Sequence, residues 1–455
     1  MFKDRAAYMR IIASVANTIA AGLPSVFGIH PWFVIKIQLS YQLHLAYAKG
    51  KLPDLSNKQP RYTVPFTSKK EVFKSAVALA KQAGKLLKTY VGVSFPNNEL
   101  LAIGNSAQNK VLNGKEQNIY LQPHINSLAP KSVLMYYIDN LGKETVERQY
   151  LKQLLHFFKL YYKLRLYISP NTNKLLNNYG QQLNTVLVAE LQQPIKGLEH
   201  FIAEQLVEYK VHYCAYKYWL KKIQPKTVLA YCYYDNRINA MFGAANSLGI
   251  TTIESQHSVI SNSHFAYAKW EQVNQLIQHF PTHFYVWSVA DKQLIIANFT
   301  SKNYKPIIEV KGIKHLSLQK HTVVPNTSQN ILICLQGIWM PEWLENFIRQ
   351  DEQYQWYIRL HPRYPNDKEQ LGALEKLQKV NIHTKAANTQ SLESLLEQSK
   401  ALITCFSGAA LEAAASGVKV LIYGEDGKTT YQEYISNGQF SYIENKTDFK
   451  NTVNS

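Results

Sequence analysis

From about residue 97 to the carboxyl terminus, short apolar runs alternate with longer segments in which apolar residues recur every three or four positions. The short runs are typical of buried strands, and the longer segments are typical of helices that bury one face. Strands alternating with helices at this spacing indicate a parallel sheet. In the first part of this region the pattern predicts strands at 99–104, 132–139, 227–234, 250–254, 283–288 and 306–310, and helices at 147–167, 193–223 and 236–248.

The last third of the chain repeats this alternation. It predicts strands at 330–335, 356–360, 380–384, 401–405 and 418–423, and helices at 342–349, 368–379, 391–398 and 409–416. A polar stretch, 317–329, is interpreted as the linker between the two regions. We therefore predict an α/β fold of two Rossmann-like domains, 97–316 and 317–455, which face each other across a cleft. Ligands are expected at the carboxyl ends of the strands of such domains.

Residues 1–96 precede the alternation, and we expect them to form a helical extension. Within it, 11–35 carries no charged side chain, as in signal or membrane-spanning segments. Pro24 and Pro31 interrupt this segment, so the favoured interpretation is two helices packed on the protein. Attachment to a membrane surface, a true span and a signal segment stay open as alternatives. The favoured interpretation predicts a cytoplasmic protein, and the first alternative predicts peripheral contact with the inner face of the plasma membrane.

A second helix signal in the extension begins at Ser68. Ser68 and Glu71 have the spacing of a capping box, which predicts a helix from there to about Thr89. One face of this helix is basic and carries Lys70, Lys74, Lys81, Lys85 and Lys88, and the other is apolar. A helix of this kind can dock on anionic lipid. More often it is an ordinary surface helix with a solvated lysine face, and we favour that interpretation.

The composition narrows the class of partner. The chain has 455 residues and a formal net charge of +18, with a pI near 9.4, which implies an anionic partner. Nucleic acid, membrane phospholipid and a phosphorylated substrate all satisfy that requirement. No nucleic-acid-binding motif is present, and the lysines are dispersed along the chain, so we expect no nucleic-acid partner. The four cysteines, Cys214, Cys232, Cys334 and Cys405, are too far apart for a metal site and are expected to be free thiols.

The most informative segment is 401–424. It predicts a buried strand, a turn at Ser407 and Gly408, a short helix, and a second strand after Gly417. A strand followed by small residues and a helix N-terminus forms an anion site, because backbone N–H groups there lack partners within the helix. We expect Ser407 and the N–H groups of Gly408 and Ala409 to hold a phosphate. Glu412, one helical turn later, is close enough to bind a sugar hydroxyl, or else lies on the helix surface.

Three motifs in this order resemble those of bacterial surface-polysaccharide glycosyltransferases. The segment Glu254-Ser255-Gln256-His257-Ser258-Val259-Ile260, followed by His264 and Tyr267, resembles their Gln-His-Gly segment, with Ser258 in place of the glycine. Arg359-Leu360-His361-Pro362-Arg363 looks like the His-Pro motif of bacterial sialyltransferases, Kdo-transferase-like enzymes, capsule transferases and teichoic-acid polymerases. Thr404-Cys405-Phe406-Ser407-Gly408, with Glu412 and Gly417, is similar to their donor-phosphate and ribose segment. The resemblance covers about 97–445 and implies the GT-B architecture, in which 97–316 binds the acceptor and 317–455 the nucleotide sugar.

The resemblance implies roles for the residues of the donor domain. His361 would stabilise the leaving nucleotide phosphate, with Arg359 or Arg363 adding positive charge and Pro362 ending the strand. The ordinary alternative for His361 is a structural residue at a strand end. Gln336 and Gly337, after the strand 330–335, are weaker candidates for donor contact, and Trp339 and Trp343 fit apolar packing better than stacking on a base. The tripeptide Glu425-Asp426-Gly427 occurs in related enzymes before the His-Pro motif. Here it follows the phosphate segment, and we interpret it as a loop near the donor.

The general base would come from the first domain. Asp235 is placed between a predicted strand and helix, where catalytic carboxylates occur, although aspartate there is equally a favoured helix N-cap. His257 is the rival base, and Glu254 is third. The resemblance places Gln256, His264 and Tyr267 on the acceptor side.

The resemblance also implies the reaction. The expected donor is a CMP-linked acidic sugar such as a nonulosonate or Kdo, and the expected acceptor is a bacterial surface glycan or its lipid-linked precursor, as in capsule and lipopolysaccharide biosynthesis. No Asp-x-Asp metal motif is present, so we expect no cofactor and no metal. A UDP-sugar-dependent transferase, a nucleotide-sugar epimerase of the same architecture and a non-catalytic scaffold of polysaccharide assembly stay open as alternatives.

Overall fold

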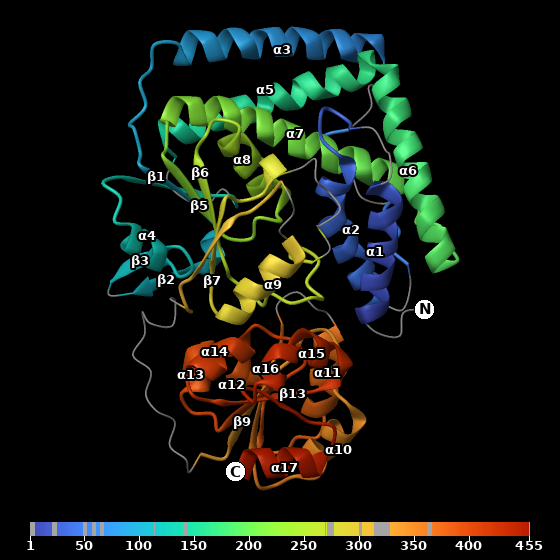
Figure 1. Cartoon of the computed structure of the whole chain (residues 1–455), viewed down its shortest axis with the longest axis vertical. Coiled ribbons are helices and arrows are strands. Elements are labelled where there is room, and N and C mark those ends of the chain that lie inside the picture. Colours follow the sequence, from blue (N-terminus) through green and yellow to red (C-terminus); the bar gives the residue numbers. More distant parts are fainter. Residues whose placement is uncertain are drawn as a thin grey trace.

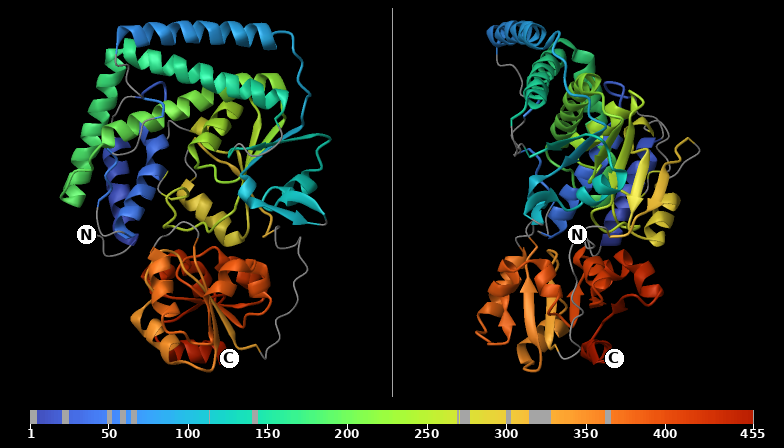
Figure 2. Two further views of the ribbon diagram at one scale, coloured as in Figure 1. Left: turned by 180° about the vertical axis from the view of Figure 1, so that it is seen from behind. Right: turned by 90° about the vertical axis from the view of Figure 1, so that its left-hand side faces the viewer.

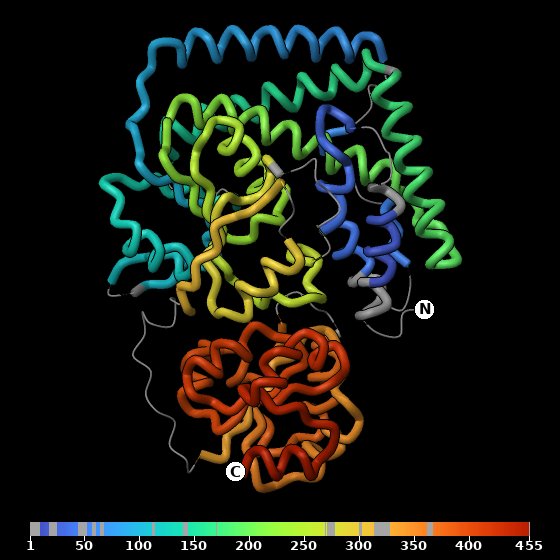
Figure 3. The backbone as a smooth tube through the Cα atoms, in the orientation of Figure 1, coloured from blue at the N-terminus to red at the C-terminus, as the bar shows by residue number. Residues whose placement is uncertain are grey.

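The computed structural model describes residues 5–20, 25–48, 52–56, 61–63, 68–112, 114–139, 144–268, 270, 277–299, 303–313, 328–361 and 366–454. These residues are coloured by position in the backbone trace of Figure 3. They form two parallel sheets of six strands each, with helices around both, and a helical layer at the end of the molecule far from the carboxyl terminus (Figure 1).

The first sheet has the order β4-β1-β5-β6-β7-β8, and every neighbouring pair is parallel. Its strands are β1 (Leu100–Gly104), β4 (Val133–Tyr137), β5 (Thr227–Ala230), β6 (Thr251–Ser255), β7 (His283–Val286) and β8 (Ile307–Val310). An antiparallel hairpin of β2 (Asn109–Leu112) and β3 (Lys115–Asn118) follows β1. The helices are η1 (Ser106–Gln108), α4 (Gln122–Leu128), α5 (Val146–Ile168), α6 (Pro170–Leu191), α7 (Leu198–Ile223), α8 (Asn236–Asn246), η2 (Ile277–His279) and α9 (Val289–Phe299).

The second sheet has the order β11-β10-β9-β12-β13-β14 and is also parallel throughout. Its strands are β9 (Asn330–Cys334), β10 (Gln355–Arg359), β11 (Ile382–His383), β12 (Ala401–Thr404), β13 (Lys419–Ile422) and β14 (Ser441–Tyr442). The helices are α10 (Glu342–Gln350), α11 (Asn366–Glu375), α12 (Thr384–Thr389), α13 (Leu392–Leu396), α14 (Ala409–Ala415), α15 (Gly424–Thr430), α16 (Gln432–Ser436) and α17 (Lys446–Asn454). In chain order the strands run 3-2-1-4-5-6, which is the doubly wound order of Rossmann domains. The predicted fold class, two Rossmann-like α/β domains, is confirmed.

The carboxyl edges of the two sheets face each other (Figures 1 and 2). Val259, which follows β6, packs in an apolar cluster formed mostly by the second domain. The Ser263 hydroxyl lies 3.3 Å from that of Thr430, and the Ser288 hydroxyl lies 3.4 Å from that of Tyr434. All these first-domain residues follow carboxyl ends of strands, and Thr430 and Tyr434 follow β13. The segments that can carry ligand-binding residues therefore lie at the contact between the domains.

The amino-terminal helices belong to the core of the first domain. α1 (Arg5–Ala20) and α2 (Pro31–Ala48) bury apolar side chains in the same cluster as β1 and α7. Lys36 of α2 is fully buried, with its Nζ 3.8 Å from the centroid of the Trp270 ring and donating to the Ala268 carbonyl at 2.5 Å. Packing in this core accounts for the buried apolar side chains of 11–16 and 26–35. Among the described residues, no helix combines the length and apolarity needed to cross a membrane.

Several boundaries differ from those that the pattern predicted. The strand expected at 227–234 ends at Ala230, because the chain turns at Cys232, whose φ is 64°. Helix α6 (Pro170–Leu191) was not predicted, and Glu425, Asp426 and Gly427 lie in α15, where a loop was expected. A Cβ on Gly427 would lie 2.4 Å from the Cys405 carbonyl oxygen, so close packing of α15 on the end of β12 accounts for this glycine. Most of the predicted linker 317–329 lies outside the described residues.

Candidate functional site

The candidate site is at the carboxyl ends of β9, β10 and β12. These strands are neighbours in the order β10-β9-β12, so the segments after the outer two start about 10 Å apart. Gln336 and Gly337 follow β9, His361 follows β10, and Ser407 follows β12. The strand order reverses between β9 and β12, and such a switch point is where doubly wound domains bind ligands. The structure thus brings these donor-side candidates to one edge of one sheet.

One buried carboxylate joins two of these segments. Asp367 accepts hydrogen bonds from the backbone N–H of Gly337 at 2.6 Å and from that of His361 at 3.0 Å. Burial raises the pKa of Asp367, and the two hydrogen bonds oppose that shift. The side-chain amide of the neighbouring Gln370 accepts from the N–H of Met340 at 2.9 Å and donates to the carbonyl of Ile338 at 3.0 Å. The loops after β9 and β10 are therefore fixed relative to each other from the start of α11.

The Arg359 side chain makes two hydrogen bonds that stabilise the fold. Its Nη1 donates to the carbonyls of Ala387 at 2.7 Å and Gln390 at 2.8 Å, at the end of α12. A cation at a helix carboxyl end is stabilised by the helix dipole. The side chain still acts electrostatically on the end of β9, where it lowers the pKa of Cys334, although burial outweighs that effect. Pro362 and Arg363 of the same motif lie outside the described residues.

Ser407 is buried at the start of α14. Its Oγ accepts from the N–H of Ala409 at 3.3 Å, its own N–H donates to Thr404 Oγ1 at 3.3 Å, and its carbonyl accepts from the Tyr431 hydroxyl. Ser407 therefore acts as a local turn residue, which is compatible with a ligand on the half-exposed Gly408. The helix is close to its predicted bounds, and Gly417 ends it with a φ of 76°.

Glu412 acts electrostatically on a residue of the first domain. This half-buried side chain projects from α14 and raises the pKa of Tyr120 in the first domain, where burial is the larger cause and Glu393 contributes as well. Glu412 also contributes to the raised pKa of Cys334 at the end of β9, again after burial. Glu412 thus lies between the β9 edge of its own domain and Tyr120 of the other.

His257 lies on the opposite side of this contact, in a cluster of three tyrosines. Its ring centroid is 5.3 Å from that of Tyr231, 5.8 Å from that of Tyr234 and 6.0 Å from that of Tyr120. The Tyr234 hydroxyl lies 3.2 Å from His257 Nε2. Since Tyr120 also responds to Glu412, the cluster connects His257 to the donor-side edge. Of the three candidate bases, His257 is the one whose ring lies in this cluster beside Tyr120.

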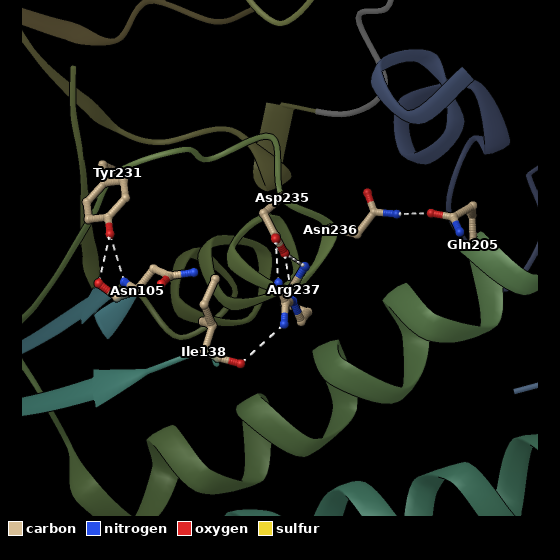
Figure 4. A network of polar contacts seen from close by, with 7 residues as sticks. All are labelled: Asn105, Ile138, Gln205, Tyr231, Asp235, Asn236 and Arg237. Atoms are coloured by element: carbon tan, nitrogen blue, oxygen red, sulfur yellow. Dashed lines mark hydrogen bonds and ion pairs between the residues drawn. The ribbon is translucent and has the colours of Figure 1, made fainter. Parts of the chain in front are cut away.

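Asp235 occupies a different environment (Figure 4). Its carboxylate accepts the backbone N–H of Arg237 at 2.9 Å, as a helix N-cap, and binds the Arg237 guanidinium through Nε at 3.0 Å and Nη2 at 2.7 Å. Arg237 also donates to the carbonyl of Ile138 at 3.2 Å. A bidentate ion pair of this kind occupies both oxygens of the carboxylate. The capping role weighed for Asp235 is present in the structure.

Glu254 is a buried structural carboxylate. It accepts from the backbone N–H groups of Cys232 and Tyr233, both at 3.0 Å, and from the Tyr267 hydroxyl at 3.1 Å. Burial raises its pKa strongly, and these hydrogen bonds oppose that shift. The carboxylate stabilises the turn at Cys232, where a positive φ is unfavourable for a residue with a Cβ. Glu254 thereby positions Tyr231 and Tyr234 on either side of His257.

Two of the three acceptor-side candidates, His264 and Tyr267, are neighbours, with ring centroids 5.0 Å apart, and Gln256 makes a separate set of contacts. The buried Gln256 accepts from the N–H of Trp287 at 2.7 Å and donates to the Ser258 carbonyl at 3.0 Å, which fixes the loops after β6 and β7. Tyr267 is fully buried against Glu254. His264 is half-exposed, and its ring lies 5.3 Å from that of Tyr234. Only His264 of this group adjoins the tyrosine cluster without being buried.

Three residues of the site were not predicted from the sequence. Asp367 is one, and Tyr120 is another. The third is Asp139, just after β4. One of its carboxylate oxygens accepts from the Ser106 N–H at 2.9 Å and from the Ser106 hydroxyl. The other oxygen is buried and has no hydrogen-bond partner among the described residues. Tyr120 precedes α4, Asp139 follows β4 and Asp367 is the second residue of α11, and these positions were their only signal in the sequence.

Comparison with known proteins gives broad similarity only. No model of a protein family and no curated protein matches the chain. Among solved structures, the UDP-GlcNAc 2-epimerase of Methanocaldococcus jannaschii is 14% identical, covers 78% of this chain and 91% of its own, and has a TM-score of 0.44. A structure described as a putative UDP-N-acetylglucosamine 2-epimerase of Listeria monocytogenes is 14% identical, covers 78% of this chain and 86% of its own, and has a TM-score of 0.46. S. aureus TarM, solved with UDP, is 15% identical, covers 53% of this chain and 52% of its own, and has a TM-score of 0.35. Such values do not show a family.

Proposed function

We propose that this chain is a GT-B-type glycosyltransferase that binds a nucleotide sugar at the carboxyl edge of its second sheet. The observation that supports the proposal most is the meeting of His361, Gln336 and Ser407 at one switch point, in a domain whose carboxyl edge faces His257 of the other domain. Phosphate groups bind where backbone N–H groups and cations converge at strand ends. Two domains that contribute separate groups can hold a donor on one side and an acceptor on the other.

The proposed reaction needs no metal. The acceptor hydroxyl oxygen forms a bond to the anomeric carbon of the sugar, and the bond from that carbon to the phosphate oxygen breaks, leaving its electron pair on the nucleotide. His361 and the Gly408 segment stabilise the charge that develops on this phosphate. His257 accepts the proton of the acceptor hydroxyl. The other two candidate bases are engaged, because Asp235 is paired with Arg237 and Glu254 is buried and accepts three hydrogen bonds. Glu412 is proposed to bind the ribose.

For the donor we keep a CMP-linked acidic sugar as the leading expectation. It depends on the resemblance of the segment that contains Arg359 and His361 and on the net charge of +18. The acceptor proposed with it is a bacterial surface glycan or its lipid-linked precursor. Residues that bind phosphate do not read the base, so a UDP-linked sugar is tested alongside.

The test is a thermal-shift titration with CMP, CDP, UDP and GDP, followed by a transfer assay with the nucleotide that binds. A ligand at about 100 times its Kd stabilises the folded chain by about 2.7 kcal/mol. We expect His361→Ala to reduce this shift and to abolish transfer, whereas His156→Ala, an exposed histidine of α5, should change neither. If no nucleotide shifts the transition, the proposal fails. Conversion of UDP-GlcNAc in the absence of any acceptor would instead identify an epimerase.

A further inference from the structure

Helix α3 (Lys69–Tyr90) lies at the end of the molecule farthest from the second domain and crosses over α5 (Figures 1 and 2). Its predicted cap is confirmed, since Ser68 Oγ accepts the N–H of Glu71 at 3.2 Å. Leu86 and Tyr90 of α3 pack in the core of the first domain, and the Tyr90 ring lies 4.7 Å from that of Tyr150 of α5. Tyr90 is the single buried residue of the helix, so α3 leaves most of its surface in contact with solvent.

A second apolar face of α3 is exposed. We call Phe73, Val77, Ala80, Gly84, Leu87 and Val91 the outer stripe, because their alternating spacing of four and three places them along one side of the helix. Phe73 is 70% exposed, Leu87 63% and Val91, at the helix cap, 68%. In the described part of the chain no element packs on this stripe. Large apolar residues that gather on one surface, in contrast to scattered ones, mark an interaction site.

The charges beside the outer stripe select its partner. Lys70, Lys74, Lys81, Lys85 and Lys88 follow one another along the next face of the helix, and the single acid of α3, Glu71, pairs with Lys163 of α5 at 3.5 Å. A second copy of this chain would bring these lysines against one another, which is unfavourable. An apolar stripe bordered by lysines matches the surface of a bilayer with anionic headgroups, where the stripe enters the acyl boundary and the ammonium groups stay at the phosphates.

An apolar cavity opens next to the outer stripe. It has a volume of about 620 Å³ and lies between α3, α5 and α7, with walls that include Leu87, Tyr90, Leu154, Phe158 and Tyr218. Leu87 and Tyr218 are exposed, so the cavity reaches the surface beside the stripe. Its size is in the range of about 300–1,000 Å³ that is typical of small-molecule pockets. The cavity has one charged wall residue, Lys222 of α7, and an ammonium group can pair with a phosphate.

We propose that α3 and this cavity form a docking site for bilayers that contain anionic phospholipid. The outer stripe enters the interface, the lysine face contacts the headgroups, and the cavity receives one acyl chain of a bound lipid. The surface is at the far end of the first domain from the candidate active site, so it does not depend on the proposed sugar chemistry.

The test is flotation of the full chain with vesicles of phosphatidylcholine alone and of phosphatidylcholine mixed with phosphatidylglycerol. We expect binding to the anionic vesicles only. Each lysine near an anionic membrane surface contributes about fivefold to the affinity for that membrane. The double variant Lys74→Glu with Lys85→Glu should therefore weaken vesicle binding by about 25-fold or more. The matched control is Lys385→Glu with Lys450→Glu, two exposed lysines of the second domain that carry the same change of charge.

The outer stripe is tested by Phe73→Ser with Leu87→Ser. These side chains are exposed, so the variant should fold, and it should lose vesicle binding. Val380→Ser, at a side chain that is 94% exposed, is the control and should bind as before. Equal binding to both vesicle types, or full binding by the stripe variant, would overturn the proposal. So would a concentration-dependent dimer that the stripe variant breaks, because a second copy would then be the partner.

The cavity is tested with phosphatidylglycerol that carries pyrene on one acyl chain. Entry of that chain into the cavity should shift the pyrene emission, and Ala83→Trp, which fills the cavity from α3, should remove the shift while flotation persists. If Ala83→Trp does not fold, Ala83→Leu is the milder variant. A persistent emission shift in a folded variant would overturn the acyl-chain site. Nucleotide thermal shifts should be unchanged in every variant, so that this proposal and the proposed function fail separately.

Discussion

The backbone N–H of His361 donates to the buried carboxylate of Asp367 at 3.0 Å. The other oxygen of the same carboxylate accepts the N–H of Gly337 at 2.6 Å. One side chain thus sets the separation between the loops after β9 and β10, and with it the separation between two candidate donor contacts. Asp367 acts through the backbone of these two loops, so we describe it as a positioning residue.

Asp367→Asn should loosen this arrangement. An amide can accept only through its oxygen, so one of the two N–H groups would face an NH₂ donor in a buried place, at a cost of about 1–3 kcal/mol. We expect lower stability of the second domain and weaker nucleotide binding, measured by urea unfolding and by the nucleotide thermal shift. The control is Asp448→Asn, a half-exposed carboxylate of α17 that accepts the Glu444 N–H at 2.9 Å. Equal nucleotide affinity in wild type and Asp367→Asn would contradict the positioning role.

Asp235→Asn distinguishes the two leading candidate bases. The substitution removes the charge that pairs with Arg237, so we expect a loss of stability of about 1–3 kcal/mol. If His257 is the base, turnover per folded molecule should stay near the wild-type value in this variant. His257→Gln should then lower kcat by about a hundredfold or more while nucleotide binding is kept. The opposite result, a large loss of kcat in Asp235→Asn with normal stability, would assign the base to Asp235.

The architecture could be predicted because its signal is local. Apolar runs followed by periodic segments gave each βαβ unit, and pairing of neighbours in a parallel sheet follows from that alternation. Helix α6 was missed because Asn and Gln dominate its exposed face. Its sequence does carry helix signals: Pro170 stands at its start, and the buried Leu176, Leu183 and Leu187 have helical spacing. Strand β14 has two residues and is defined only by its pairing with β13.

The site was only partly predictable, because its contacts join distant positions. The sequence placed His361 and Ser407 at strand ends, and the sheet order then brought them together. It could not show that Asp367 bonds Gly337, which is thirty residues away, or that Tyr120 lies near Glu412. It also could not show that Asp235 is paired with Arg237, since aspartates that cap helices and those that act as bases occupy the same place in a sequence.

An ion pair between Lys110 and Glu393 joins the β2–β3 hairpin to α13 across the domain contact. Burial alone would raise the pKa of Glu393, but its hydrogen bonds and the charge of Lys110 outweigh burial and hold that pKa at about 2. Lys110→Glu should replace attraction by repulsion and separate the domains, which small-angle X-ray scattering would record as a larger radius of gyration. Adding Glu393→Lys should restore the wild-type value. Lys115→Glu, an exposed residue of the same hairpin, is the control, and an unchanged radius in Lys110→Glu would show that this pair does not hold the domains.

Glu208 of α7 should make the stability of the first domain depend on pH. Burial is the main cause that raises its pKa from 4.5 to about 7; Asp235 and Glu204 add to the shift, and Arg237 and Arg61 oppose it. Between these two values the folded state holds a proton that the unfolded state releases, so stability falls as pH rises through this window. A shift of this size corresponds to about 3 kcal/mol. Glu208→Gln should therefore flatten the fall and be the more stable form above pH 7.

The measurement is the urea midpoint of wild type and Glu208→Gln from pH 5 to pH 8. Buried His212 and His279 act in the opposite direction, because burial lowers their pKa values to about 4 and about 3, and stability is then lost as pH falls below 6.5. Both histidines are present in both proteins, so the difference between the two curves isolates Glu208. Glu190→Gln, an exposed carboxylate of α6, should follow the wild-type curve. A constant difference across the range would mean that Glu208 is ionised throughout it, and that burial in α7 does not control its charge.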